Sequence, residues 1–117
     1  MNYLISPLLK DEEIQIFKKK LEENNEYWED GRKTAGSYAA KVKNNLQLNR
    51  NSDASQNLSK LIINKILSNP LIKSFSLPKK IHGIMFSKSC EGMKYGRHID
   101  NAFMPSGRAD LSFTIFF

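Results

Sequence analysis

His98 and Asp100 stand two residues apart near the C-terminal end of the chain, and they are the residues best suited to metal chemistry. In an extended strand, residues i and i+2 point to the same face, so both side chains could reach one ion while Ile99 points the other way. An imidazole nitrogen with a carboxylate oxygen suits iron, manganese, zinc or nickel better than calcium or copper(I). The spacing predicts two ligands of a metal site, although it is also typical of a strand-end histidine beside a turn aspartate.

The segments on either side of this pair are predicted to form β-strands. Residues 81–88 alternate between two faces, and a loop that contains glycines connects them to the pair. After the pair, residues 101–107 are rich in turn formers, and residues 108–117 again alternate strongly. A loop next to a strand end is a usual place for a metal site with open coordination positions.

Two amphipathic helices are predicted in the first part of the chain. The first covers about residues 11–23, where apolar residues recur at helical spacing and acids fill the first turn. The second covers residues 51–69, with polar capping residues before it and a proline after it. Short strands are predicted over residues 2–9 and within residues 37–49. Helices followed by strands indicate an α+β chain, and the length indicates a single domain over residues 1–117.

The composition excludes several classes of protein. The 117 residues are 40% hydrophobic and 26% charged, which is ordinary for a globular domain. No run of about 18 apolar residues predicts a membrane helix, and the N-terminus lacks the pattern of a signal peptide. The single cysteine, Cys90, cannot form an internal disulfide. We therefore expect a cytoplasmic protein without a membrane partner.

The charge is distributed unevenly. Residues 1–30 hold eight acids and four bases, whereas residues 31–117 hold four acids and fourteen bases. A basic face is a feature of nucleic-acid-binding proteins. Here the bases are scattered, without the interleaved aromatic side chains of a stacking platform. A solvated basic surface is therefore expected in place of a nucleic-acid partner.

Several motifs together resemble the bacterial PKHD-type hydroxylases, a family of Fe(II)- and 2-oxoglutarate-dependent dioxygenases related to prolyl 4-hydroxylase. The similarity covers nearly the whole chain, with Trp28 at the tryptophan position of the family. The N-terminal motifs are Asp30-Gly31-Arg32, Thr34-Ala35-Gly36 and Val42-Lys43-Asn44-Asn45-Leu46-Gln47. The C-terminal motifs are Tyr95-Gly96-Arg97-His98-Ile99-Asp100 and Arg108-Ala109-Asp110-Leu111-Ser112.

The resemblance implies a fold, a set of cofactors and an enzymatic activity. The N-terminal helices would pack on a double-stranded β-helix (jelly-roll, cupin-like) that is incomplete at the C-terminus, because family members are roughly twice as long. In such hydroxylases two histidines and one carboxylate hold Fe(II), an arginine binds the cosubstrate 2-oxoglutarate, and L-ascorbate keeps the iron reduced. His98 and Asp100 would be two of the three metal ligands. The other histidine and the arginine belong to the C-terminal half of family members.

Other residues receive roles from the same resemblance. Tyr95 would lie beside the cosubstrate, with Arg97 and Asn101 near the metal. The polar residues Asn44, Asn45 and Gln47, which are unusual in a strand, would form a polar wall near the substrate entrance, or else a polar edge or turn. His82 is expected to be a half-buried structural residue.

Three functions stay open at this point. In the first, the chain is part of a hydroxylase with an unknown substrate, and it is inactive or poorly active by itself. In the second, it is an inactive fragment that binds another macromolecule through its basic surface or through an exposed edge strand at residues 108–117. In the third, it binds a metal without catalysis or completes its site with a partner chain, which would require a homo-oligomer.

Overall fold

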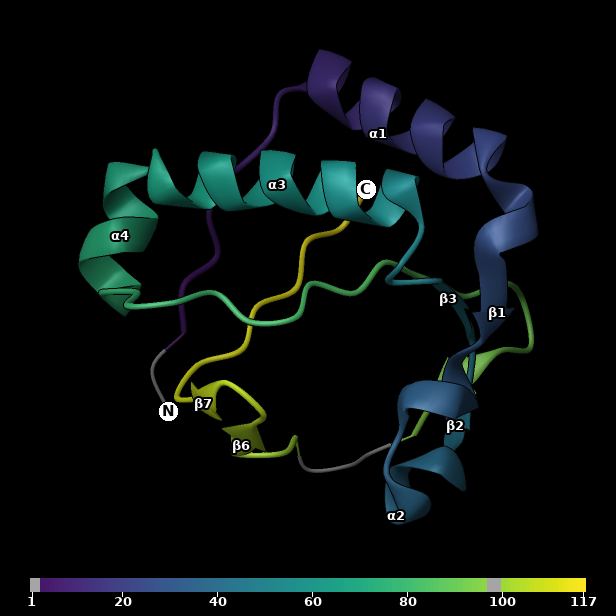
Figure 1. Ribbon diagram of the computed structural model, residues 1–117. Coiled ribbons are helices and arrows are strands. Elements are labelled where there is room, and N and C mark those ends of the chain that lie inside the picture. Colours follow the sequence, from purple (N-terminus) through teal and green to yellow (C-terminus); the bar gives the residue numbers. More distant parts are fainter. Residues whose placement is uncertain (1–2, 97–99) are drawn as a thin grey trace.

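The computed structural model describes residues 3–96 and 100–117, and it places two packed helices beside a group of short strands (Figure 1). The helices are α1 (Asp11–Glu23), α2 (Ser37–Ala40), α3 (Asp53–Leu67) and α4 (Pro70–Ser76). The strands are β1 (Trp28–Asp30), β2 (Lys43–Asn44), β3 (Leu46–Leu48), β4 (Ser87–Lys88), β5 (Lys94–Tyr95), β6 (Phe103–Met104) and β7 (Gly107–Arg108). Two 3₁₀ turns cover Asn25–Tyr27 and Gly31–Thr34.

Helix α1 forms where the sequence predicts it. Acidic residues occupy its first turn, where the helix dipole favours negative charge. At its end the side-chain amide of Asn24 donates a hydrogen bond of 2.7 Å to the Lys20 carbonyl. Phe17 is buried, and Glu13 forms an ion pair with Lys65 of α3. One face of α1 is thus fixed against α3.

Helix α3 also confirms its prediction, but the chain then turns into a helix that was not predicted. Ser52 caps α3 by accepting a hydrogen bond of 3.2 Å from the Ser55 amide. Asn69 and Pro70 end α3 as expected and also start α4. The Asn69 side chain accepts a hydrogen bond of 3.1 Å from the Ile72 amide, and proline suits the first helical position.

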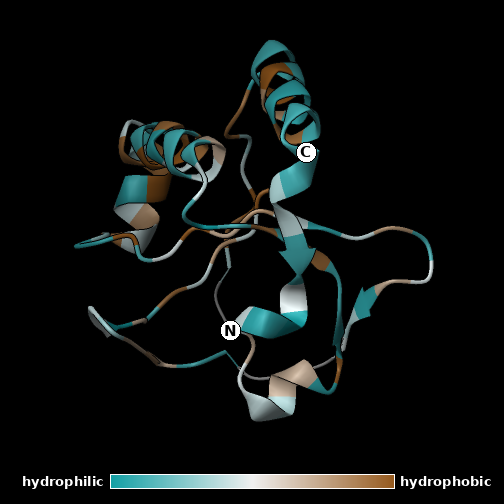
Figure 2. Cartoon of the chain, turned by 45° about the vertical axis from the view of Figure 1, so that its right-hand side comes forward, coloured by the Kyte–Doolittle hydropathy of each residue, from teal (hydrophilic) through white to brown (hydrophobic). Residues whose placement is uncertain are grey.

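The hydrophobic core lies between the helices and the three-stranded sheet. Figure 2 colours the helices in both teal and brown, as expected for helices that bury one face. Trp28 of β1 is half-buried against the core, and its indole N–H donates a hydrogen bond of 3.3 Å to the Leu21 carbonyl. The buried apolar residues are Phe17, Leu48, Leu58, Ile62, Ile66 and Phe86.

The strands form three small antiparallel sheets. The largest has the order β1-β3-β4, with Trp28 opposite Leu48 and Leu46 opposite Lys88. The others are the pairs β2-β5 and β6-β7. The α+β class is therefore confirmed. The sheets of the described residues do not close into a barrel.

Most predicted strands are wrong or too long. Residues 3–9 form no strand. Residues 37–49 contain the strands β2 and β3, as predicted, but residues 37–40 form one helical turn, in which the Ala40 amide donates a hydrogen bond of 2.9 Å to the Gly36 carbonyl. Of residues 81–88 only the last two are in a strand, because Gly83 takes a φ of +39° that a continuous strand does not allow. Of residues 108–117 only Arg108 is in a strand, and the Ala109 amide donates one further hydrogen bond of 2.8 Å to the Ala102 carbonyl.

The C-terminal segment packs on the core in part, although it forms no strand beyond Arg108. Ile115 is half-buried against the core, and the Phe117 ring stacks on Phe17 at 5.4 Å between centroids. Leu111, Phe113 and Phe116 are exposed. The unpaired edge strand that the second open function would use is therefore not formed by this segment.

A close backbone approach joins the turn after β1 to the start of β3. The Gly31 amide donates a hydrogen bond of 2.9 Å to the Asn45 carbonyl. A Cβ atom at Gly31 would overlap the Asn45 side-chain oxygen. Only glycine fits without displacing Asn45, so this contact explains the glycine of the Asp30-Gly31-Arg32 motif.

Replacing Leu58 by alanine should destabilise the fold by about 2–5 kcal/mol, because its side chain is 0% exposed and the loss leaves a cavity. Leu61→Ala is the matched control on the same helix, since Leu61 is 43% exposed, and it should change the free energy of unfolding by about 0.5 kcal/mol or less. Urea unfolding followed by circular dichroism measures both. Equal losses in the two variants would contradict the core assignment.

Gly31→Ala should lower the free energy of unfolding by about 1–3 kcal/mol, because the added methyl group meets the Asn45 side chain. Gly36→Ala is the control, since no atom lies within 4 Å of a Cβ at that position. It should change stability by about 0.5 kcal/mol or less. If the clash with Asn45 is the cause, Gly31→Ala should lower the free energy of unfolding less in a protein that already carries Asn45→Ala. An equal loss in both backgrounds would refute this explanation.

Candidate functional site

The predicted metal pair lies only partly within the described residues. Asp100 is described and exposed, whereas His98 and Arg97 lie outside the described residues. The pairing of His98 with Asp100 therefore stays a prediction. Tyr95 ends β5, and Asn101 directly follows Asp100 and accepts a hydrogen bond of 3.1 Å from the Phe103 amide through its side-chain oxygen.

The ladder between β2 and β5 brings the two motif regions of the chain together. Lys43 lies opposite Tyr95, and Asn44 lies opposite Lys94. The next hydrogen bond runs from the Gly96 amide to the Val42 carbonyl at 2.8 Å. The motif that begins at Val42 is thus the direct neighbour of the strand that leads to His98. The sequence does not predict this pairing.

Gly96 allows this close approach. A Cβ atom at Gly96 would lie 2.8 Å from the Val42 Cβ, closer than carbon atoms of real side chains approach. A larger residue would push β5 away from β2. The glycine before the metal pair therefore has a packing role that requires no contact with a metal.

Lys43 and Tyr95 form the polar contact between these strands. The Lys43 ammonium lies 4.8 Å from the centroid of the Tyr95 ring, which is the geometry of a cation–π interaction. Burial lowers the pKa of Lys43, and the charge of Arg50 adds to this effect. Burial raises the pKa of Tyr95, and the charge of Asp100 adds to it. Tyr95 therefore contacts the Lys43 ammonium and is also influenced by the charge of Asp100.

The other polar residues of this region are mostly structural. Asn45 and Gln47 are buried, and Asn44 is exposed. Gln47 accepts a hydrogen bond from the Thr34 hydroxyl, which connects the Val42–Gln47 motif with the Thr34-Ala35-Gly36 motif. Within the described part of the chain, the buried Asn45 side-chain oxygen has no hydrogen-bond partner.

The Asp30-Gly31-Arg32 motif forms its own ion pair. The Arg32 guanidinium donates three hydrogen bonds to the Asp30 carboxylate, of 3.1, 3.0 and 2.6 Å, and the Arg32 amide donates a fourth of 2.9 Å. These contacts lower the pKa of Asp30 to about 2. They fix the start of the 3₁₀ turn at Gly31–Thr34, so this motif orders the backbone beside Asn45.

The remaining candidate ligands do not join Asp100. His82 is half-buried, as predicted, and its Nδ1 contacts the Ser106 hydroxyl. Cys90 is exposed. Across residues 3–96 and 100–117, no three His, Cys, Asp or Glu side chains are grouped so as to hold a metal ion. The described residues thus form no complete metal site, and a metal at Asp100 would require further ligands.

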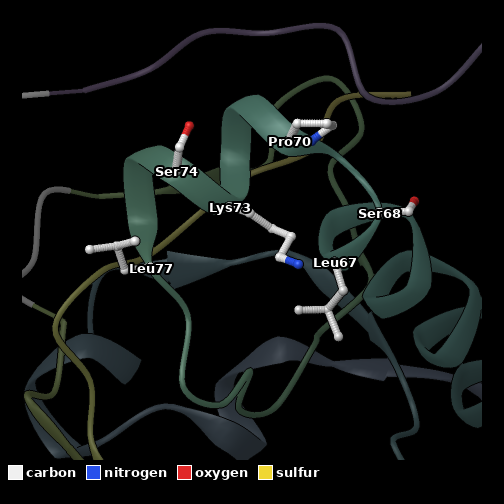
Figure 3. Close-up of a pocket in the computed structure, with 6 residues that line it drawn as sticks. All are labelled: Leu67, Ser68, Pro70, Lys73, Ser74 and Leu77. Carbon is white, nitrogen blue, oxygen red and sulfur yellow. The ribbon is translucent and has the colours of Figure 1, made fainter.

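An open hollow at the corner between α3 and α4 is separate from these residues (Figure 3). It is lined by Leu67, Ser68, Pro70, Lys73, Ser74 and Leu77. Figure 1 places α4 and β2 at opposite sides of the molecule, so this hollow cannot serve the candidate site. Among the described helices, none has the length and apolar character needed to cross a membrane.

Three curated proteins that are similar to the chain carry the same name. A PKHD-type hydroxylase of Prochlorococcus marinus strain AS9601 is 66% identical over 98% of the chain, and one of strain MIT 9312 is 67% identical over the same share. A PKHD-type hydroxylase of strain NATL1A is 53% identical over 99% of the chain. In each case the match covers 52% of the relative, so the chain spans about half the length of these proteins.

Other comparisons give no match. No family model matches the chain, and no solved structure is significantly similar to it. Identities of 53–67% over almost all 117 residues far exceed what unrelated sequences show. The chain is therefore a homologue of the PKHD-type hydroxylases and corresponds to about half of one.

Proposed function

We propose that the chain contributes the N-terminal half of an Fe(II)- and 2-oxoglutarate-dependent hydroxylase whose complete catalytic domain is a jelly roll. The observation that carries this proposal is the pairing of β2 with β5, which sets the Val42–Gln47 motif beside the strand leading to His98 and Asp100. The names of relatives that are 66% and 67% identical support a hydroxylase. The rest of the domain would supply the third ligand and the arginine for 2-oxoglutarate.

When bound, iron and 2-oxoglutarate supply the oxidative decarboxylation that drives hydroxylation of a C–H bond, with L-ascorbate as the reductant that maintains Fe(II). His98 and Asp100 would hold the metal through an imidazole nitrogen and a carboxylate oxygen. Asp100 is an exposed residue.

Tyr95 has a separate part in this proposal. A tyrosine phenol is protonated at neutral pH, and the raised pKa of Tyr95 reinforces this. A protonated phenol can donate a hydrogen bond to an oxygen atom of a bound cosubstrate. The phenol therefore would orient a ligand beside the metal and would not act as a base.

Anaerobic Fe(II) titration of the chain tests the metal pair. Two ligands from one chain predict weak binding, with a dissociation constant well above about 1 μM. His98→Ala and Asp100→Ala should each weaken binding at least about tenfold, because each removes a ligand. His82→Ala is the control, since His82 contacts Ser106, and it should leave the affinity unchanged. Equal affinities in all four proteins would contradict the assignment.

Conversion of 2-oxoglutarate to succinate tests the need for the other half of the domain. With Fe(II) and ascorbate present, the 117-residue chain should produce little or no succinate, because its described residues form no complete metal site. The full-length relative of strain AS9601 serves as the positive control. Succinate formation by the chain that His98→Ala abolishes would show instead that a second subunit or His82 completes the site.

A further inference from the structure

Lys43 is a buried cation without a matching anion. Its residue is 7% exposed, and it is the only buried residue of the described part that carries a formal charge. No carboxylate of the described residues lies within ion-pair distance of it. Residues 1–2 and 97–99, which the structure does not describe, contain no Asp or Glu in the sequence. No acidic side chain of this chain therefore neutralises Lys43.

The Tyr95 ring offsets only part of the cost of burying this charge. The stabilisation from a cation–π contact is much smaller than the hydration free energy that an ammonium group gives up on burial. Arg50 adds a second positive charge to the surroundings of Lys43 and lowers the pKa of Lys43 further. Lys43 thus has a cationic neighbour and no acidic partner among the described residues, and this combination favours a bound anion.

The position of Lys43 indicates which site the anion would occupy. Its ammonium faces the ring of Tyr95, whose phenol in turn feels the charge of Asp100. The β2–β5 ladder fixes this order, because Lys43 and Tyr95 are direct partners in the register. Tyr95 is followed in the sequence by the proposed metal pair, so Lys43 lies on the strand next to the one that leads to Asp100.

We propose that Lys43 binds a carboxylate group of a ligand in this site, which makes it a specificity-determining residue for an anionic molecule. The inference rests on the proposed function and extends it by giving the charge class of a ligand. The carboxylate can come from 2-oxoglutarate itself or from the molecule that is hydroxylated. The cation–π contact with Tyr95 would hold the ammonium in place for either one.

NMR titration of the metal-free chain tests the proposal. The probes are acetate, its neutral analogue acetamide, and 2-oxoglutarate, each followed through the backbone amides of Lys43 and Tyr95 in the presence of a chelator. The variants are Lys43→Met, which keeps the length without the charge, and Lys43→Arg, which keeps the charge. Lys41→Met is the matched control, because Lys41 is an exposed lysine two residues away.

Acetate should shift both amides and acetamide should not. Lys43→Met should weaken carboxylate binding roughly tenfold to a hundredfold, whereas Lys43→Arg and Lys41→Met should retain it. Much tighter binding of 2-oxoglutarate than of acetate would assign Lys43 to the cosubstrate. Equal affinities for acetate and 2-oxoglutarate would show that Lys43 recognises a single carboxylate group, and this would assign Lys43 to the molecule that is hydroxylated.

Two results would overturn the proposal. One is the absence of any shift at Lys43 up to about 100 mM acetate, and the other is carboxylate binding that Lys43→Met leaves unchanged. Since the titration needs no metal, its outcome is separate from the Fe(II) assignment. Carboxylate binding without Fe(II) binding would refute only the proposed metal site.

Discussion

The two-residue ladder between β2 and β5 is the constraint on which the candidate site depends. It joins segments about fifty residues apart in the sequence, and its register puts Lys43 against Tyr95. The approach is close because Gly96 has no side chain to strike Val42. This ladder sets the position of Lys94 and Tyr95, which precede the metal pair, relative to the N-terminal motifs.

A second close contact supports the first. Gly31 lies against Asn45, and the Thr34 hydroxyl bonds Gln47. Gly31 and Thr34 precede β2 in the sequence. Their contacts with Asn45 and Gln47 hold β3, the strand that follows β2. The N-terminal motifs thus act mainly as a scaffold. Lys43 is the exception, because its charge is buried without an acidic partner among the described residues.

The helices could be predicted from the sequence because their signals are local. Apolar spacing and capping residues identify α1 and α3 to within about two residues. Helix α4 was missed because Asn69-Pro70 was interpreted only as the end of a helix, although the same pair also suits the start of one.

The strands could not be predicted equally well, because a strand needs a partner that supplies hydrogen bonds. Residues 109–117 alternate as a strand would, yet no described segment forms a ladder with them. The pairing of β2 with β5 carries no local signal at all. Of the candidate site, Tyr95 and Asp100 follow from the motif, whereas Lys43 becomes a candidate only once its burial is known.

Paramagnetic broadening by Mn(II) tests the central claim most directly, namely that the metal pair lies beside the β2–β5 ladder. Mn(II) suits the same nitrogen and oxygen ligands as Fe(II), and it broadens NMR signals of nearby nuclei. The account predicts selective loss of the Lys43, Asn44 and Tyr95 amide signals at low Mn(II), while those of Leu67 and Leu77 at the α3–α4 corner persist. Broadening confined to the acidic first turn of α1, with the β2 signals intact, would contradict it.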